Sequence, residues 1–500
     1  MARSVAKTHA GALVGVEENG IHRFLGIPYA APVDGAARFL PVRPVAPWSG
    51  QRDASVPGPA IPQAPDPILP RLTSAPPLTS DEAIGLNLNV WTPGVDGAAR
   101  PTLVWIHGGA FRTGRGSDPW FSGTRLVAAH DVVLVSINYR LGPLGFLSLE
   151  SLLGEEYETS ANLGVLDVIA ALEWVRDNIS SFGGDPRQVT VFGESAGAGM
   201  VSVLLAAERA RGLFRAAIMQ SGGAMVLDDK DAAEAVARTF LEALGLSHSE
   251  AHRLRELPVE TLIDASRIVI GKESWSRGDR RAFRPVVDGV VLRELPARAV
   301  ANGRWARVPV VIGTNRDEGR MHLVLGGGFP LTSEDDRAVA FARRNKAAAE
   351  VLAYLRRRLP QGDDGDLAAQ LLTEDRFLLP SLELAEACVA QQSPTWLYRF
   401  DWCSTALGGQ LRACHALDLP FVFDNLDIPG VSAFTGEAPP AALATAMNSA
   451  WAGFARALNP STPEQSWPPY EIPERQTMVF SSTSAVESDP AKDAREFWNQ

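Results

Sequence analysis

The sequence predicts an α/β fold in which helices cover a doubly wound, mostly parallel sheet. Short, nearly continuous apolar runs such as LVWI (103–106) recur along the chain. Strands of this kind are buried on both faces, as in a parallel sheet. Helical apolar patterns lie between these runs, for example over 165–179. Strands that alternate with helices indicate parallel βαβ units.

The first 100 residues differ from the rest, because they are rich in proline and turn residues. VGVEENGIHRFLGIPYA (14–30) predicts two strands joined by a turn at Glu18-Asn19-Gly20. The prolines of 57–77 predict an irregular surface segment. From Pro101 onward, the expected strands lie at 101–106, 132–140, 188–195, 308–314 and 395–402, and the expected helices at 165–179 and 196–208.

Two long stretches interrupt this alternation. Residues 228–300 and 333–392 are mostly helical in pattern, and the chain contains no internal repeat or low-complexity tract. Helical insertions of this length commonly cover the top of such a sheet and line a pocket. We therefore predict a single domain over 1–500, with these two stretches as helical cap insertions.

Composition and charge exclude several classes of protein. The 46% hydrophobic and 21% charged residues are ordinary for a globular chain, and the net charge of −11 disfavours nucleic acid as a partner. No run of 18 apolar residues predicts a membrane span, and the apolar stretch 10–16 is too short for a signal peptide. Three cysteines without a CxxC motif favour a reducing compartment. We expect a cytoplasmic protein, as a monomer or a homodimer.

The most specific motif is G-x-S-x-G at Gly193-Glu194-Ser195-Ala196-Gly197. It lies between an apolar strand and a run that can form a helix. Such a sharp turn requires glycines, because no side chain fits beside the serine. The motif predicts that the hydroxyl of Ser195 is exposed above the sheet as a nucleophile.

A second motif, His107-Gly108-Gly109, follows the apolar run that ends at Ile106. Acyl transfer develops negative charge on the former carbonyl oxygen, and backbone amides at glycines can approach that oxygen closely. We predict that the amides of Gly108, Gly109 and Ala196 form an oxyanion hole. His107 is expected to orient this loop by hydrogen bonding and not to transfer protons.

A nucleophilic serine needs a base and an orienting acid. In this architecture the order along the chain is serine, acid, histidine, so the base lies C-terminal to Ser195. Position favours His415, which follows a strand-like run and a Gly-Gly loop. His322 lies only about one turn beyond Glu318, too close for the two to reach the site from separate loops. The other histidines in this part of the chain are His248 and His252.

His248 and His252 are spaced i, i+4, as in a metal-binding pair. However, zinc needs at least three protein ligands, and the sequence offers no third one. The same segment, Ser247 to Glu250, predicts a helix capping box. We expect no metal and no cofactor.

The acid is expected just beyond the apolar run VPVVI (308–312), in the segment GTNRDEG (313–319). A carboxylate there emerges at the carboxyl end of the sheet, the same edge as Ser195. Spacing alone does not distinguish Asp317 from Glu318, and an exposed loop acid can also be merely solvated.

Many separate motifs resemble the type-B carboxylesterase family, which includes bacterial para-nitrobenzyl esterases and, more distantly, cholinesterases. They cover nearly the whole chain. They are FLGIPYAAPVDGAARF (24–39), PWSGQRDA (47–54), LNVWTP (88–93), WIHGGAF (105–111), NYRLGPLGFL (138–147), ALEWVRDNISSFGGDP (171–186), VFGESAGA (191–198), GLFRAAIMQSG (212–222), GTNRDEG (313–319), HALDLPFVF (415–423) and WPPYEIPERQTMVF (467–480).

The resemblance implies an α/β-hydrolase fold and site residues that match the motifs of the family. The acid of the family maps onto Glu318 and its base onto His415. A serine in the family motif Q-S-G maps onto Ser221, either holding His415 or bonded to backbone as a buried turn serine. The family cysteine is absent from 82–90, so the resemblance implies no disulfide there.

The expected activity is serine hydrolysis of small carboxylic esters through an acyl-enzyme on Ser195. Activity is expected to fall on acidification with an apparent pKa of about 6–7, because His415 must be neutral to act as a base. The alternatives are a carbamate or amide hydrolase with the same triad, and a non-catalytic binding protein on the same fold. Phe111, Trp120 and Trp275 are candidates for the substrate pocket, although for any one of them the pattern favours a core position.

Overall fold

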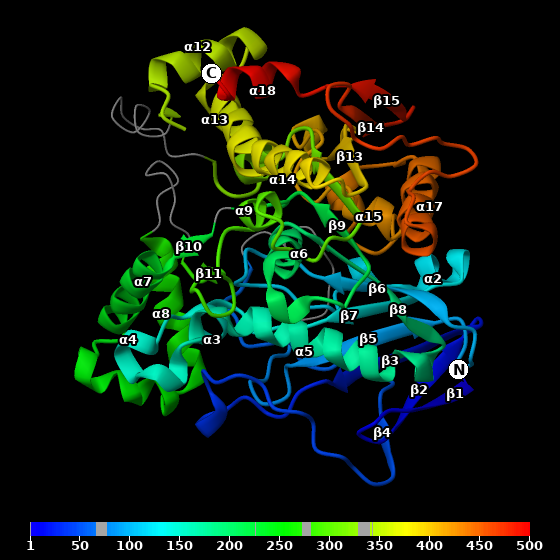
Figure 1. Ribbon diagram of the computed structural model, residues 1–500, viewed down its shortest axis with the longest axis vertical. Helices are drawn as coiled ribbons and strands as arrows, with labels where there is room; N and C mark the ends of the chain where they lie inside the picture. The colour runs from blue at the N-terminus through cyan, green and yellow to red at the C-terminus, as the bar shows by residue number, and fades with distance from the viewer. Residues whose placement is uncertain (1, 67–77, 226, 273–281, 329–340, 343) are drawn as a thin grey trace.

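A large twisted sheet runs through the molecule, and helices pack on both of its faces (Figure 1). The computed structural model describes residues 2–66, 78–225, 227–272, 282–328, 341–342 and 344–500. Trp275 and part of the proline-rich segment 57–77 lie outside the described residues.

The described strands of this sheet follow an order that is not the order of the chain. Across the sheet they are β1 (Ala2–Lys7), β2 (Ala12–Glu18), β3 (Ile21–Pro28), β5 (Asn87–Thr92), β7 (Val133–Ile137), β6 (Arg100–Ile106), β8 (Gly184–Glu194), β9 (Ala216–Gln220), β12 (Val310–Asn315), β13 (Thr395–Phe400), β14 (Gln476–Phe480) and β15 (Ala485–Ser488), with β4 (Gln51–Asp53) beside β2. Two short strands, β10 (Asp228–Asp229) and β11 (Val286–Val287), pair separately.

The central strands from β7 to β14 are all parallel, whereas the strands at both edges pair antiparallel, except that β4 pairs parallel with β2. This arrangement confirms the predicted mostly parallel sheet. The turn at Glu18-Asn19-Gly20 joins β2 to β3 as an antiparallel hairpin, also as predicted. The carboxyl ends of β8, β12 and β13 lie at one edge, where loops can bring distant residues together.

Alternate residues of each central strand enter two different cores. Val104 and Ile106 of β6 pack with α5 (Leu163–Asn178) and α6 (Ala196–Ala206) on one face. Leu103 and Trp105 pack on the other face, where α17 (Ala441–Ala457) lies. Because successive side chains of a strand point to opposite faces, a strand covered on both sides must be apolar throughout. This explains the continuous apolar runs of the sequence.

The remaining helices lie over the two faces and at the ends of the sheet. They are α2 (Thr124–His130), α3 (Gly142–Phe146), α4 (Glu150–Leu153), α7 (Lys230–Ala243), α8 (Val259–Gly271), α9 (Pro296–Ala301), α10 (Gly319–Val324), α12 (Ala348–Arg358), α13 (Asp364–Leu372), α14 (Leu379–Ala390), α15 (Leu419–Val422), α16 (Ser432–Thr435), α17 (Ala441–Ala457) and α18 (Lys492–Trp498).

The stretches 228–300 and 333–392 are largely helical where they are described, as the sequence predicts. Figure 1 shows α12, α13 and the C-terminal helix α18 gathered at one end of the molecule, and their apolar side chains form a separate small core. The division into one domain with cap insertions stays a prediction.

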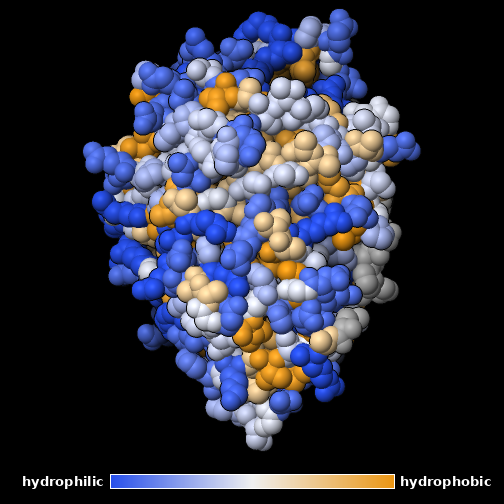
Figure 2. Space-filling view, turned by 90° about the vertical axis from the view of Figure 1, so that its right-hand side faces the viewer, coloured by the Kyte–Doolittle hydropathy of each residue, from blue (hydrophilic) through white to orange (hydrophobic). Residues whose placement is uncertain are grey.

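The surface is mainly hydrophilic on the face shown in Figure 2, where apolar residues form small, separate groups. Among the described residues, no helix combines the length and the apolar character that a bilayer crossing requires.

Candidate active site

Ser195 lies at the tip of a sharp turn between β8 and α6. Its backbone has φ 55° and ψ −122°, a left-handed φ that L-residues seldom adopt. A Cβ added at Gly197 would lie 2.0 Å from the carbonyl oxygen of Ile106, and one at Gly193 would lie 2.5 Å from the carbonyl carbon of Gly197. The two glycines of the motif are therefore required by close backbone contacts, for the steric reason that the sequence indicates.

Three side chains that are far apart in the chain meet at this turn. His415 Nε2 lies 2.8 Å from Ser195 Oγ, and His415 Nδ1 lies 2.6 Å from Glu318 Oε2. Glu318 is fully buried and His415 is 5% exposed. The geometry suits a neutral imidazole that donates from Nδ1 to the carboxylate and accepts the serine proton at Nε2.

The end of β12 holds both partners of the serine, Glu318 and His415. Glu318 follows β12, and its Oε1 accepts a hydrogen bond from the backbone amide of Asn315 at 2.7 Å. The side-chain amide of Asn315 in turn donates to the carbonyl oxygen of Cys414, directly before His415, at 2.7 Å. One residue at the end of β12 thus binds both the acid and the loop that carries the imidazole.

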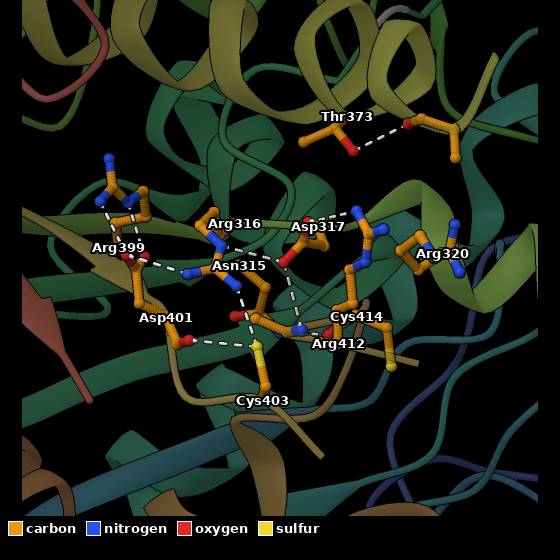
Figure 3. Close-up of polar contacts among 12 residues, drawn as sticks. Asn315, Arg316, Asp317, Arg320, Thr373, Arg399, Asp401, Cys403, Arg412 and Cys414 are labelled. Atoms are coloured by element: carbon orange, nitrogen blue, oxygen red, sulfur yellow. Dashed lines mark hydrogen bonds and ion pairs between the residues drawn. The ribbon is translucent and has the colours of Figure 1, made fainter. Parts of the chain in front are cut away.

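Asp317, the alternative acid in the sequence, faces away from the imidazole. Its carboxylate accepts hydrogen bonds from Arg316 at 3.0 Å and from the backbone amide of Ala413 at 3.3 Å. The backbone amide of Asp317 donates back to the carbonyl oxygen of Ala413 at 2.9 Å. Asp317 therefore links the loop of Glu318 to the loop of His415. Arg316 extends this link to Asp401 and to the sulfur of Cys403 (Figure 3).

Glu194, the variable residue of the G-x-S-x-G motif, is an unforeseen member of the site. Its carboxylate is buried, and Oε1 lies 3.1 Å from His415 Nε2. Burial raises the pKa of Glu194 to about 8, although the charge of His415 lowers it. Burial lowers the pKa of His415, but Glu194 and Glu318 raise it by more, to about 9. Its place beside the nucleophile in the sequence was the only available signal.

Two further groups near the imidazole also went unrecognised in the sequence. The fully buried carboxylate of Asp418 accepts hydrogen bonds from Gln220 at 2.9 Å and Tyr398 at 3.0 Å. The ring of His322 stacks beside that of His415, with 6.2 Å between the centroids. His322 thus lies at the site, although its closeness to Glu318 in the chain predicted that the two could not both reach it.

Of the three residues predicted to form the oxyanion hole, Ala196 follows Ser195 directly and Gly108 lies close to it. A Cβ added at Gly108 would lie 3.2 Å from Cβ of Ser195, and one at Gly109, which has a left-handed φ of 105°, would lie 2.1 Å from the carbonyl oxygen of Thr113. Within the described part of the chain, the amides of Gly108, Gly109 and Ala196 donate to no protein acceptor. They are thus available to an incoming oxygen.

His107 stabilises the loop of these glycines. Its Nδ1 lies 2.8 Å from the carbonyl oxygen of Gly108, and its ring stacks on Tyr139 with centroids 4.7 Å apart. The hydroxyl of Tyr139 donates to the carbonyl oxygen of His107 at 2.9 Å. Burial lowers the pKa of His107 to about 4, so the ring is neutral at physiological pH. These contacts agree with an orienting role.

Ser221 lies next to the nucleophile turn but makes neither of the two expected hydroxyl contacts. It is fully buried with a φ of 54°, and its backbone amide donates to the carbonyl oxygen of Gly313 at 2.8 Å. Its Oγ has no hydrogen-bond partner among the described residues. The structure therefore shows neither a bond to His415 nor one to backbone from this hydroxyl.

The aromatic pocket candidates are buried among other aromatic side chains. Phe111 is 2% exposed and packs on Phe146 with 5.4 Å between centroids, and Trp120 packs on Phe434. That Phe111 lines a substrate pocket stays a prediction.

The histidine pair at 248 and 252 belongs to a helix start. Ser247 and Glu250 form the predicted capping box, and His252 Nδ1 lies 3.1 Å from the carbonyl oxygen of Ser249. Over the described residues, no cluster of three or more His, Cys, Asp or Glu is arranged to hold a metal ion.

The chain is similar to known proteins over almost its whole length. A family model described as the carboxylesterase family matches residues 2–498. The chain is 38% identical to the para-nitrobenzyl esterase of Bacillus subtilis, over 99% of this chain and 98% of the other. It is 33% identical to the phenmedipham hydrolase of Pseudarthrobacter oxydans, over 97% and 96% of the two chains.

A solved structure extends the likeness to three dimensions. The carboxylesterase of Geobacillus stearothermophilus, determined at pH 6.2, superposes with a TM-score of 0.89 at 38% identity and covers 99% of this chain and 100% of the other. These likenesses cover almost the whole chain and therefore the whole α/β-hydrolase fold. The chain therefore belongs to the carboxylesterase family and is a serine hydrolase of carboxylic esters.

Proposed function

We propose that Ser195 is the nucleophile of this esterase, His415 its general base and Glu318 the acid that orients the imidazole. The observation that carries the proposal is the position of His415, with one ring nitrogen 2.8 Å from Ser195 Oγ and the other 2.6 Å from Glu318 Oε2. Burial of the acid supports it, since a charge shielded from water holds the imidazole in one tautomer.

The reaction follows from these positions. Ser195 Oγ attacks the ester carbonyl while His415 Nε2 takes its proton, and the carbonyl oxygen becomes an oxyanion. The amides of Gly108, Gly109 and Ala196 bind this oxyanion, and such a donor contributes about 2.7–4 kcal/mol to the transition state. His415 then protonates the departing alcohol. Water, deprotonated by the same imidazole, releases the acid from the acyl-enzyme.

The decisive experiment replaces the nucleophile. Ser195→Ala should lower hydrolysis of a nitrophenyl ester by at least about a thousandfold and abolish labelling by a fluorophosphonate. Ser202→Ala is the matched control, because this serine lies on α6 and bonds only to the carbonyl oxygen of Gly199 in its own helix. Full turnover by a folded Ser195→Ala enzyme would refute the assignment.

Two neighbouring residues complete the proposal. Ser221 supports His415 from the end of β9, and its buried, unpaired hydroxyl is the supporting observation. Ser221→Ala should reduce kcat by several-fold, and unchanged kinetics would remove this role.

Phe111, next to the proposed oxyanion hole, limits the length of the acyl group that the pocket accepts. Phe111→Leu should shift preference along a series of nitrophenyl esters of graded acyl length, whereas an unchanged series would make it a core residue.

A second substrate class is suggested by the phenmedipham hydrolase relative, which is 33% identical over almost the full length. We propose phenmedipham as a candidate substrate, and carbamates or amides more generally as alternatives to simple esters. The same nucleophile and oxyanion site would serve each of them. Phenmedipham, aryl carbamates and anilides assayed beside the ester series would decide the preference, and ester turnover alone would restrict the enzyme to esters.

We further propose that the enzyme works in the cytoplasm as a monomer or homodimer, with the segments 228–300 and 333–392 as a cap on a single domain. The three described cysteines are unpaired, which suits a reducing compartment. Cell fractionation tests the location and light scattering tests the oligomeric state. Recovery of the enzyme in an extracellular fraction would overturn the proposed location.

A further inference from the structure

A π-helical turn lies against the site, next to β12. This turn, η9 (Thr373–Leu378), joins α13 to α14, so the two helices and the turn form one continuous helical segment. A π-turn widens a helix by one residue and occurs frequently at functional sites. Two of its side chains, Thr373 and Phe377, contact the loops of Glu318 and His415.

Thr373 binds the backbone directly after the proposed acid. Its hydroxyl accepts a hydrogen bond from the amide of Gly319 at 3.0 Å and donates to the carbonyl oxygen of Ala369 at 2.9 Å. A Cβ added at Gly319 would lie only 2.1 Å from the same carbonyl oxygen, so the backbones are in close contact here. Figure 3 shows Thr373 on the helical segment above the loop of Asp317.

Phe377 packs on the imidazole itself. The ring centroids of Phe377 and His415 lie 4.7 Å apart at an angle of 45°, and Phe377 is 4% exposed. This contact covers part of the imidazole and restricts its rotation about the bond to the backbone. The hydrogen bonds to Ser195 and Glu318 need the ring to stay in one plane.

The side of η9 that faces away from the imidazole is bound by the C-terminal helix α18 and by α12. The carboxylate of Glu374 is fully buried and accepts hydrogen bonds from Trp498 at 2.7 Å, Gln370 at 2.9 Å and Tyr354 at 3.1 Å. Trp498 belongs to α18 and Tyr354 to α12. The turn is therefore held by the small core at the end of the molecule as well as by its contacts with β12.

We infer that η9 is a positioning element for the Glu318–His415 pair, in which Thr373 fixes the backbone after the acid and Phe377 fixes the plane of the imidazole. This inference rests on the proposed roles of Glu318 and His415. Neither residue touches the substrate in this inference; both act through the pair.

The first test compares Thr373→Val with Thr373→Ser. Valine keeps the shape but loses the hydroxyl, so kcat should fall roughly tenfold with KM changed less than twofold, and serine should restore kcat. Thr239→Val is the matched control, because the hydroxyl of Thr239 donates to the carbonyl oxygen of Ala235 within α7 at 3.0 Å, away from the site. It removes the same kind of hydroxyl and should leave kcat per active site unchanged.

Titration with a fluorophosphonate counts active sites in every variant and separates two kinds of failure. A wild-type enzyme that is not labelled would refute the proposed nucleophile and leave η9 without a pair to position. A labelled enzyme in which Thr373→Val keeps the wild-type kcat, or in which valine and serine behave alike, would overturn the inference.

The second test uses the pH profile of Phe377→Leu. Burial lowers the pKa of His415, so opening its face to water should move the acid limb of kcat/KM to higher pH while kcat falls. The charged or titratable groups that face the imidazole, Glu194, Glu318, Asp418 and His322, are unchanged in this variant. A profile that coincides with that of wild type would count against a positioning role for Phe377.

Discussion

Glu194 Oε1 lies 3.1 Å from Nε2 of His415, the same nitrogen that faces Ser195 Oγ. The imidazole is thus in contact with two buried carboxylates, one on each ring nitrogen. A negative charge at this distance stabilises the protonated ring, and burial of both groups strengthens the effect because little water screens it. The proton affinity of the base consequently depends on a residue that takes no part in the proposed proton transfer.

The pH dependence of the enzyme should reveal this carboxylate. His415 must be neutral to act as a base, so kcat/KM is lost as the pH falls through the pKa of the imidazole. Burial lowers that pKa, but the charge of Glu194 and the charge and hydrogen bond of Glu318 raise it to about 9, so the acid limb is expected above the pH of 6–7 that an ordinary histidine gives. Glu194→Gln should move the acid limb down by about one pH unit or more.

The measurement is kcat/KM for a neutral nitrophenyl ester from pH 5 to 10, with Glu208→Gln on the surface as the control. An acid limb that stays in place in Glu194→Gln would show that the carboxylate does not control the base.

Removal of Asp317 should weaken the link between the two catalytic loops. Its carboxylate accepts a hydrogen bond from the amide of Ala413, two residues before His415, and it directly precedes Glu318. Asp317→Ala should lower kcat roughly three- to tenfold, since a small displacement of the acid relative to the base misaligns the proton transfer.

Steady-state kinetics with Asp427→Ala as the control would check this, because Asp427 pairs with Arg125 on the surface. Equal kcat values for the two variants would contradict a role for Asp317 in holding the loops.

The glycine after the nucleophile should not tolerate a methyl group. A Cβ at Gly197 would lie 2.0 Å from the carbonyl oxygen of Ile106, so Gly197→Ala must displace β6 or α6. We expect a loss of roughly a hundredfold in kcat/KM and about 1–3 kcal/mol in the free energy of unfolding.

Gly271→Ala is the matched control, since a Cβ there would meet nothing within 4 Å. Ester assays and urea unfolding of both variants check the prediction, which is wrong if Gly197→Ala resembles Gly271→Ala.

A buried ion pair behind the site should be costly to break. Arg140 binds Asp167 through two nitrogens, at 2.7 and 2.8 Å, and the side chains are 2% and 0% exposed. Asp167→Ala leaves the guanidinium buried without its partner, so the free energy of unfolding should fall by about 3–5 kcal/mol.

Asp177→Ala is the control for this experiment. It breaks a surface pair in which Arg176 and Asp177 are 51% and 41% exposed, and should cost no more than about 1 kcal/mol. Similar losses in the two variants, measured by urea unfolding, would contradict the prediction.

The sequence predicted much of the central sheet because local patterns carry that information. A strand buried on both faces must be apolar at every position, so runs such as 133–137 reveal themselves without reference to any other segment. The turn at Ser195 is equally local, since its glycines are required by close contacts within a few residues and with the neighbouring strand. The order of the strands and the antiparallel edges depend on long-range pairing and have no comparable local pattern.

The residue pattern alone could not distinguish Asp317 from Glu318 as the catalytic acid. Both are acidic, both follow the same strand, and only the resemblance to a family favoured Glu318. In the structure the loop turns so that Glu318 is directed towards His415 and Asp317 towards Ala413. Neighbouring side chains of a loop point in different directions, and packing of the whole chain decides which one faces inward.

By itself, the sequence determined the strands and helices around the site, the serine turn and the chemical types of the side chains that could act there. The tertiary structure alone decided that Glu194 lies beside His415 and that Thr373 and Phe377 lie against the pair. The physical reason is range. Hydrophobic periodicity and turn sterics act over a few residues, whereas hydrogen bonds and ring contacts between remote segments exist only once the sheet and its helices have packed.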